Sequence, residues 1–228
     1  MSIIFSVSDA WRMTYPGAAA GILAMYKVNN LEGHAGLEQR KTELEASLRA
    51  RYSDFDRKAL ELVTPFPAYD VYYKRFKKTY HVYLQLESIV FKGRTIPSVT
   101  SLIEAMFMAE LKNMLLTAGH DLATIHPPVS LDVATGNEHY IVLRGQDQTL
   151  KPGDMFITDE QGVMSSIIYG PDQRTQITPS THEVLFTVYA PPGIGEQAVY
   201  THLQNIRENV LLVSPEAEVS LLQVLSAQ

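Results

Sequence analysis

The sequence predicts an α+β fold in which a helical N-terminal half packs on a mostly antiparallel β-sheet. Long segments with helical spacing of apolar side chains lie before about residue 128. Later segments are short, rich in β-branched residues, and separated by Gly, Pro, Asp or Asn. No repeat or low-complexity linker interrupts the 228 residues, so we expect residues 1–228 to form a single domain.

The first third of the chain predicts one strand followed by helices. Residues 18–30 form a continuous apolar run after a Pro-Gly turn, which is typical of a buried strand. Residues 34–52 are rich in helix formers and place leucines on one face, and 56–63 predicts a second helix. The Pro-rich run "TPFPAYD" then predicts a break.

The middle of the chain contains one ambiguous segment and one long predicted helix. Residues 81–91 fit either a strand or a helix, because short apolar runs allow both. Residues 98–117 predict a helix with Ser98 as its N-cap and Gly119 just beyond its end.

The last hundred residues predict strands and a closing helix. The helix is expected at about 195–210. The expected strands are "VSLDVAT", "HYIVLR", "DMFITD", "GVMSSIIYG" and "HEVLFTVYA".

Composition narrows the class of protein. The net charge of −6 and the pI of about 5.6 argue against a protein that coats nucleic acid by bulk charge. The absence of cysteine excludes disulfides and thiol catalysis. With no signal peptide and no apolar run of about 20 residues, we expect a cytoplasmic protein without membrane contact.

Motifs for familiar chemistries are missing. The sequence has no nucleophile elbow, phosphate-binding loop, dinucleotide fingerprint or His-Glu-x-x-His pair. The seven histidines lack the spacing of metal ligands. We therefore expect no metal and no cofactor.

Glu110, Asn113 and Thr117 form one polar stripe on the otherwise apolar helix predicted at 98–117. Buried charge is costly unless it is paired, so the stripe must face solvent, a partner group or a cavity. In one interpretation Glu110 only fixes packing. In the other, the stripe leads to His120 and lines a polar pocket.

A basic and aromatic segment at 72–83 is the one local concentration of positive charge. Its lysines and tyrosines are suited to phosphate contact and base stacking, although a solvated helix face explains them equally well. His81 shares a face with Gln85, as a solvated surface or as part of a site. The candidate nucleic-acid-binding residues are Lys74, Arg75, Lys77, Lys78, Tyr80 and His81.

Two loops of the second half carry polar side chains. Residues 165–181 gather serines, threonines, Asp172 and Arg174 around a Gly-Pro turn, and we expect these last two to pair. The run "APPGIGE" at 190–196 is either a simple strand-to-helix turn or an anion site at a helix N-terminus.

Two longer stretches carry a family resemblance. "KGRTIPSVTSLIEAMFMAELKNMLLTAGHDLATI" and "GVMSSIIYGPDQRTQITPSTHEVLFTVYAP" resemble the B3/B4 domain of the phenylalanyl-tRNA synthetase β subunit. They are closer still to free-standing bacterial proteins built from that domain alone. The resemblance covers roughly residues 18–210.

The resemblance implies a site and a ligand. In the synthetase this domain hydrolyses tyrosine wrongly attached to the phenylalanine tRNA, which implies tRNA or aminoacyl-tRNA as the partner here. The stretch around His120 is similar to the family's Gly-x-x-His-x-Phe-Asp-Leu but shorter. Ser165-Ser166 replaces the usual Gly-Gly, and Thr187 stands where the synthetase has Glu, which leaves a changed ligand open.

The candidate residues follow from the polar stripe, the loops and the resemblance together. The expected catalytic residues are His120, Glu110 and Ser166. The expected substrate-binding residues are Asn113, Thr117, Asp121, Ser165, Asp172, Arg174, Thr181 and Thr187.

Three functions remain open at this point. The leading hypothesis is a stand-alone module that recognises tRNA or aminoacyl-tRNA and hydrolyses mischarged tRNA. The second is a binding module for RNA or an amino-acid-like ligand, without catalysis. The third is an enzyme that has reused the fold for a small molecule. A complete aminoacyl-tRNA ligase does not fit into 228 residues, and the sequence leaves the oligomeric state open.

Overall fold

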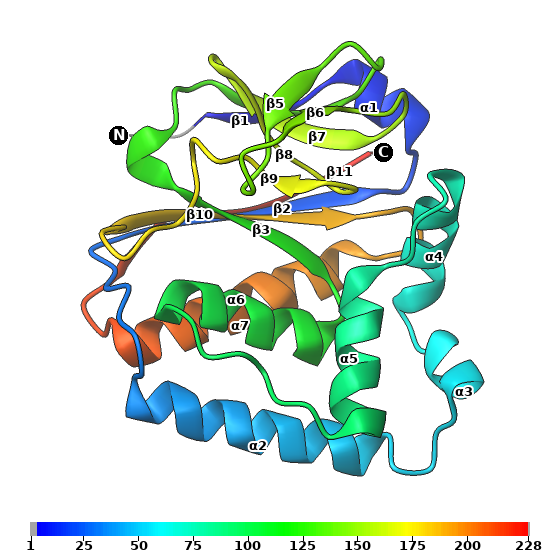
Figure 1. The fold of residues 1–228 in the computed structure, drawn as a ribbon. Coiled ribbons are helices and arrows are strands. Elements are labelled where there is room, and N and C mark those ends of the chain that lie inside the picture. Colours follow the sequence, from blue (N-terminus) through cyan, green and yellow to red (C-terminus); the bar gives the residue numbers. More distant parts are fainter. Residues whose placement is uncertain (1–3, 228) are drawn as a thin grey trace.

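Two stacked β-sheets and a layer of helices make up the fold, as Figure 1 shows. The computed structural model describes residues 4–227. The smaller sheet has the order β11-β2-β10-β3 and is antiparallel throughout. Helices cover its lower face and the larger sheet covers its upper face (Figure 1). The predicted α+β class is therefore confirmed.

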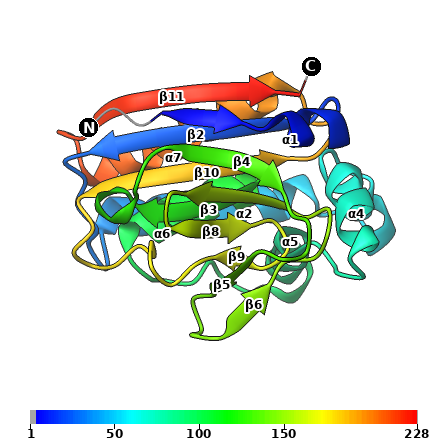
Figure 2. The same ribbon diagram turned by 90° about the horizontal axis from the view of Figure 1, so that it is seen from above.

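The four strands of the smaller sheet come from distant parts of the chain. β2 and β10 occupy its centre, and β3 and β11 are its edges (Figure 2). β2 is buried along almost its whole length because it is covered on both faces, which explains its continuous apolar sequence. The strands are β2 (Ala19–Tyr26), β3 (Leu116–Asp121), β10 (Glu183–Ala190) and β11 (Glu218–Ser226).

The upper sheet has the order β1-β4-β7-β8-β9, in which only β1 and β4 run parallel. A small two-stranded sheet, β5-β6, lies beside it. The strands are β1 (Phe5–Val7), β4 (Val129–Val133), β5 (His139–Ile141), β6 (Asp147–Thr149), β7 (Met155–Asp159), β8 (Gly162–Ser166) and β9 (Gly170–Pro171).

The helices form the lower layer and one end of the molecule. α6 and α7 lie against the smaller sheet, α2 lies below them, and α5 stands across the end beside α4 and α3 (Figure 1). The helices are α1 (Asp9–Thr14), α2 (Ala35–Arg51), α3 (Arg57–Glu61), α4 (Phe66–Arg75), α5 (His81–Lys92), α6 (Ser101–Asn113), the 3-10 turn η1 (Leu122–Thr124) and α7 (Glu196–Val213).

Close packing of α7 on β2 depends on a glycine. A Cβ added to Gly21 would lie 2.5 Å from the Cγ1 atom of Val199. Only a residue without a side chain therefore lets α7 approach the centre of the sheet this closely.

The helix predicted at 98–117 is wrong at both ends. It begins at Ser101, and Ser98 instead accepts a hydrogen bond from the Lys41 Nζ at 3.0 Å. It ends at Asn113, because Met114 takes a left-handed conformation with φ of 59°. Residues 116–121, including Gly119, then form the edge strand β3, so pairing with β10 prevails over local helix propensity.

The other expected elements are close to those observed. Residues 81–91 are the helix α5, and the predicted break at "TPFPAYD" is short because α4 already begins at Phe66. The closing helix α7 runs three residues beyond its predicted end. The short elements before residue 18 and the last strand, β11, were not predicted. Within residues 4–227 no helix is long and apolar enough to span a membrane.

One tyrosine ties α4 to the end of the β3–β10 ladder. The Tyr69 hydroxyl accepts from the Leu116 N–H at 2.9 Å and donates to the Tyr189 carbonyl at 2.6 Å. Leu116 and Tyr189 are paired in the register of these strands, so this hydroxyl bridges the two backbones. The Tyr69 ring is fully buried and stacks on Tyr80 with 4.0 Å between centroids.

We predict that Tyr69→Phe lowers the free energy of unfolding by about 1–3 kcal/mol, because the Leu116 N–H and the Tyr189 carbonyl lose their buried partner. Urea unfolding followed by circular dichroism measures the change. Tyr200→Phe, at an exposed tyrosine of α7, is the matched control and should change little. Equal midpoints for the two variants would contradict the prediction.

Candidate functional site

A cavity of about 370 Å³ lies against the open edge of β3. Its walls come from α5 and α6 below and from the segments around β8 and β9 above. The apolar lining residues include Ile103, Met106, Phe107, Leu143, Ile167 and Ile177. The polar lining residues are His81, Glu110, Thr117, Ser166, Gln176 and Tyr189.

Glu110 is the carboxylic acid that lines this cavity. Its Oε1 atom accepts a hydrogen bond of 2.7 Å from the Thr117 N–H, which joins the last turn of α6 to the second residue of β3. Burial raises the pKa of Glu110 to about 8, although the Thr117 hydrogen bond opposes the rise. Glu110 therefore fixes packing, as the first interpretation expects, and it also borders a cavity, although that cavity is mostly apolar and His120 does not line it.

Asn113 and Thr117 meet at a histidine that sequence reasoning missed. The Asn113 Nδ2 atom lies 3.1 Å from His202 Nδ1, and the Thr117 hydroxyl lies 2.6 Å from His202 Nε2. Burial lowers the pKa of His202 to about 3, so the ring is neutral. In the neutral ring one of these nitrogens donates and the other accepts, and the tautomer decides which. Thr117 lines the cavity, whereas Asn113 orients His202 behind it.

His120 lies on the opposite face of β3 and is not part of the cavity lining. It is fully buried, with Nδ1 2.7 Å from the Thr175 hydroxyl and Nε2 3.2 Å from the Ser165 hydroxyl. Thr175 also donates to Asp172. Burial chiefly, with Arg174 nearby, lowers the pKa of His120 to about 3. The neutral ring holds β3 against the upper sheet.

The buried chain from His120 continues to the cavity wall. The Ser165 hydroxyl lies 2.7 Å from the Tyr189 hydroxyl, and Tyr189 lines the cavity. His120 and Ser165 thus reach the cavity indirectly, through Tyr189. The neighbouring Ser166 lines it directly, and its Oγ atom accepts from the Tyr169 N–H at 3.1 Å.

The remaining expected ligand-binding residues support loops around the site. Arg174 binds both carboxylate oxygens of Asp159 at 2.8 Å, and its Nε atom lies 3.5 Å from Asp172, the expected partner. Thr181 donates to Asp121 at 2.7 Å. Buried Thr187 is 3.5 Å from the Ala118 carbonyl. The cavity lining does not include the expected residues Asp121, Asp172, Arg174, Thr181 and Thr187.

The basic segment is only partly available to a ligand. Lys74 pairs with Asp70 at 2.6 Å, and Arg75 lies 5.3 Å from the centre of the Tyr15 ring. Lys77 and Lys78 are exposed, with Lys78 5.8 Å from the centre of the Tyr169 ring.

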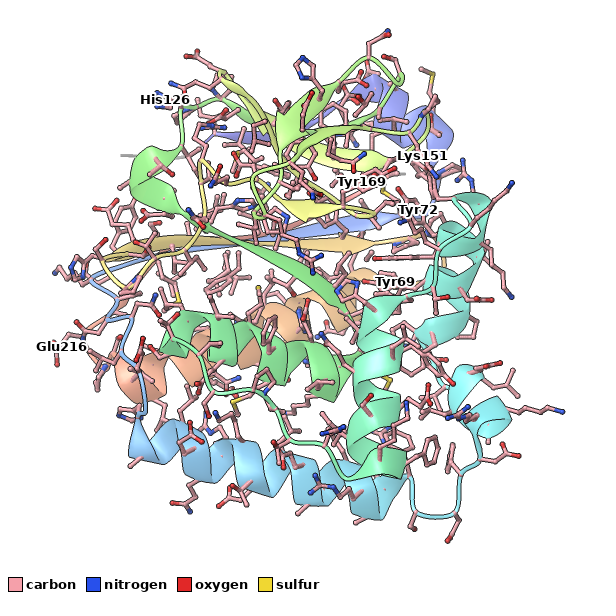
Figure 3. All side chains as sticks on the ribbon, viewed as in Figure 1. Tyr69, Tyr72, His126, Lys151, Tyr169 and Glu216 are labelled. Carbon is pink, nitrogen blue, oxygen red and sulfur yellow. The ribbon has the colours of Figure 1, made fainter. Side chains whose placement is uncertain are left out.

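The aromatic side chains of this segment serve the core instead of stacking on bases. Tyr80 is buried and donates to the Met114 carbonyl at 3.1 Å, which corrects its assignment to an exposed surface. Tyr72 is also buried, and its hydroxyl donates to Asp154 and accepts from the Met155 N–H, where α4 meets the upper sheet (Figure 3). His81 belongs to the wall of the cavity.

The sequence predicted several of the polar residues that line the cavity, but it did not predict the apolar ones. Glu110, Thr117 and Ser166 were expected, and His81 was expected in another role. Tyr189, Gln176 and the apolar walls were missed, because apolar residues in strands and helices give the same signal whether they line a core or a cavity. Within residues 4–227 no three acidic or histidine side chains converge as a metal site would require.

The raised pKa of Glu110 predicts a loss of stability in alkali. Its folded pKa of about 8 exceeds the ordinary 4.5, so the folded state holds an extra proton between these values and stability falls as pH rises through them. Glu110→Gln keeps the acceptor for Thr117 without the titration. Between pH 6.5 and 9 the wild type should lose about 2 kcal/mol more than this variant.

Urea unfolding at a series of pH values measures this difference. Glu160→Gln, at an exposed glutamate, is the control and should follow the wild type. Parallel curves for wild type and Glu110→Gln would show that Glu110 ionises normally in the folded state.

Comparison with known proteins identifies the family. Residues 68–208, more than half of the chain, match the model of the B3/4 domain. Phenylalanine–tRNA ligase β subunits of Mycoplasma pneumoniae and Mycoplasma genitalium are 33% and 30% identical over 69 residues. These cover 30% of this chain and only 9% of each relative.

A solved structure supports the fold. An N-terminal fragment of the phenylalanyl-tRNA synthetase β subunit from Pyrococcus horikoshii matches 96% of this chain and 50% of its own, with a TM-score of 0.50 and 13% identity. Because the identity is so low, this likeness supports the architecture alone. The family match and the architecture agree, and the chain belongs to the B3/4 domain family.

Proposed function

We propose that this B3/4 domain recognises the aminoacyl end of a charged tRNA and hydrolyses the ester of a mischarged one. The observation that carries the proposal is the cavity at the β3 edge, with apolar walls and one carboxylic acid of raised pKa. Apolar pockets with a few convergent polar groups and a perturbed pKa are typical of ligand sites. The volume of about 370 Å³ suits an amino-acid side chain and its ester group.

Glu110 is suited to act as a general base in this reaction. Ester hydrolysis requires a water that loses a proton as its oxygen attacks the carbonyl carbon, and a base with a pKa near the working pH does this best. The pKa of about 8 leaves a minor fraction of Glu110 ionised at neutral pH. As the carbon–oxygen bond to the ribose breaks, the protonated carboxyl returns the proton to the leaving oxygen.

Ser166 is suited to stabilise the oxyanion. Its Oγ atom accepts from the Tyr169 N–H, and its hydroxyl also interacts with the Asp154 carboxylate. In this proposal the hydroxyl turns from Asp154 to donate to the negative charge that develops on the carbonyl oxygen. His120 acts in this proposal as a positioning residue, which holds the Tyr189 hydroxyl through Ser165. A catalytic contact by His120 is no longer proposed, because both of its ring nitrogens are bonded within the core.

The exposed lysines beside the site supply phosphate contacts in this proposal. Lys77 and Lys78 follow α4 and precede His81, which lines the cavity. Lys74 and Arg75 contribute less, because Asp70 and Tyr15 already engage them.

We predict that the protein deacylates at least one mischarged tRNA, with a rate that rises with pH toward a plateau above about 8. Glu110→Gln should lose roughly 100-fold or more in kcat, because general-base catalysis contributes about 10²–10⁴. The measurement is release of labelled amino acid from a panel of aminoacyl-tRNAs that includes tyrosyl-tRNA for phenylalanine. Protein-free reactions at each pH correct for spontaneous hydrolysis.

Binding without turnover would favour the second candidate, a recognition module without catalysis. The protonated state of most Glu110 at neutral pH and the distance of His120 from the cavity favour this candidate. A shift of aminoacyl-tRNA on a gel with the ester intact identifies it. Turnover of simple aminoacyl esters with no response to any tRNA would point instead to a small-molecule enzyme.

We predict that Lys77→Gln with Lys78→Gln weakens tRNA binding and flattens the plot of log K against log salt by about 1–2 units, since each lost phosphate contact removes about 0.9. Filter binding at four salt concentrations measures both quantities. Lys27→Gln, at a lysine that pairs with Glu218 beyond the far end of β2, is the control. Identical slopes for the double variant and the control would assign these lysines to solvated surface.

A further inference from the structure

At the open edge of β3, the backbone N–H and C=O groups of one residue face the cavity. In an antiparallel ladder, alternate residues direct their N–H and C=O groups toward the neighbouring strand, and the residues between them face away. β3 has β10 on one side and no strand on the other. The outward groups of β3 therefore need partners of another kind.

Two outward N–H groups have such partners inside the molecule. The Thr117 N–H donates to the Glu110 carboxylate at 2.7 Å, and the Asp121 N–H donates to the Thr175 carbonyl at 2.7 Å. The Leu116 N–H points the other way, to the Tyr69 hydroxyl that also binds Tyr189 of β10. These three bonds establish which residues of β3 face outward.

Gly119 lies midway between the two occupied positions. By the alternation its N–H and C=O face outward, and within residues 4–227 neither has a hydrogen-bond partner outside the sheet ladder. Gly119 is also part of the cavity wall. One donor and one acceptor of the main chain, in a fixed extended geometry, are thus presented to whatever enters the cavity.

The surroundings of Gly119 account for the glycine. A Cβ added there would lie 2.7 Å from Ile177 Cδ1 and 3.4 Å from Met106 Sδ. Both neighbours line the cavity, so a side chain at 119 would push apolar walls into the space beside the free backbone groups.

We propose that the Gly119 N–H and C=O bind the main-chain groups of one α-aminoacyl unit, as a neighbouring strand would. The ligand carbonyl accepts from the Gly119 N–H and its α-amino group donates to the Gly119 carbonyl. The apolar walls at Met106 and Ile177 take its side chain. This inference deepens the proposed function, and rests on it, by naming the recognised unit.

The edge admits a single residue and excludes a peptide strand. An added strand would need the outward N–H groups of Thr117 and Asp121, which lie one pairing step to each side of Gly119. Glu110 and Thr175 already occupy both. The ligand must therefore be a free aminoacyl group, with its ester or amide end directed out of the cavity.

Amide hydrogen exchange measured by NMR tests the inference with controls inside the same strand. The probe is adenosine that carries L-phenylalanine through a 3′-amide, which cannot be hydrolysed. Without the probe, the Gly119 amide should exchange faster than those of Ala118 and His120, which face β10. At a probe concentration 100 times its Kd, Gly119 exchange should slow by roughly 100-fold, while Ala118 and His120 change little.

The outcomes separate this inference from the proposed function. If the probe does not perturb the methyl groups of Ile103 and Ile177, the cavity is not an aminoacyl site and the proposed function fails. If it perturbs them and Gly119 exchange is unchanged, the function stands and the main-chain contact is overturned. A capped pentapeptide of apolar residues should leave Gly119 exchange unchanged, and protection by it would contradict the single-residue limit.

Discussion

The structure depends on how an edge strand is kept buried. β3 is covered on both faces and has no neighbour on one side, so its outward backbone groups would be costly if they were left without partners. Glu110, on the helix immediately before the strand, accepts a hydrogen bond from one of these groups, the Thr117 N–H. The same carboxyl cannot be fully solvated there, so its pKa rises. The need to bond the outward backbone groups of β3 therefore places a titratable carboxyl in the wall of the cavity.

Two neutral histidines hold the opposite faces of the same strand. His202 of α7 binds Thr117 on the helical side, and His120 binds Ser165 of β8 on the other side. Each accepts at one ring nitrogen and donates at the other, so each requires the neutral ring that burial favours. The layers above and below β3 are thus joined through side chains of the strand. Hydroxyl groups at both joints continue to the cavity wall, at Thr117 and at Tyr189.

The fold class and most of the long elements could be predicted from local patterns, because α2 and α7 have helix-forming sequences with apolar residues on one face, whereas β2 and β10 are continuous apolar runs of strand length. The end of α6 could not. Lys112 and Asn113 are only weak stop signals, and the left-handed residue after them is Met114 instead of a glycine. The strand that follows depends on pairing with β10. Glu110, Asn113 and Thr117 do lie close together, but they do not share one face of a helix, because Thr117 belongs to β3. Asn113 of α6 and Thr117 of β3 both contact His202 of α7, and Glu110 joins them by accepting from the Thr117 N–H.

The same tertiary constraint explains why His120 was expected in the wrong place. On a continuous helix with a glycine stop, His120 would stand at the exposed end, near a pocket. In a strand, successive residues point to opposite faces, so the His120 side chain points toward the upper sheet, away from the face of Gly119. On that side Ser165 and Thr175 bind the ring and leave it no access to the cavity. Thr187, paired with the adjacent Ala118, shares that closed face, so a carboxylate there would approach from above the sheet. Here the acid comes from α6 below the sheet, which turns the cavity toward the edge and makes the backbone of Gly119 part of its wall.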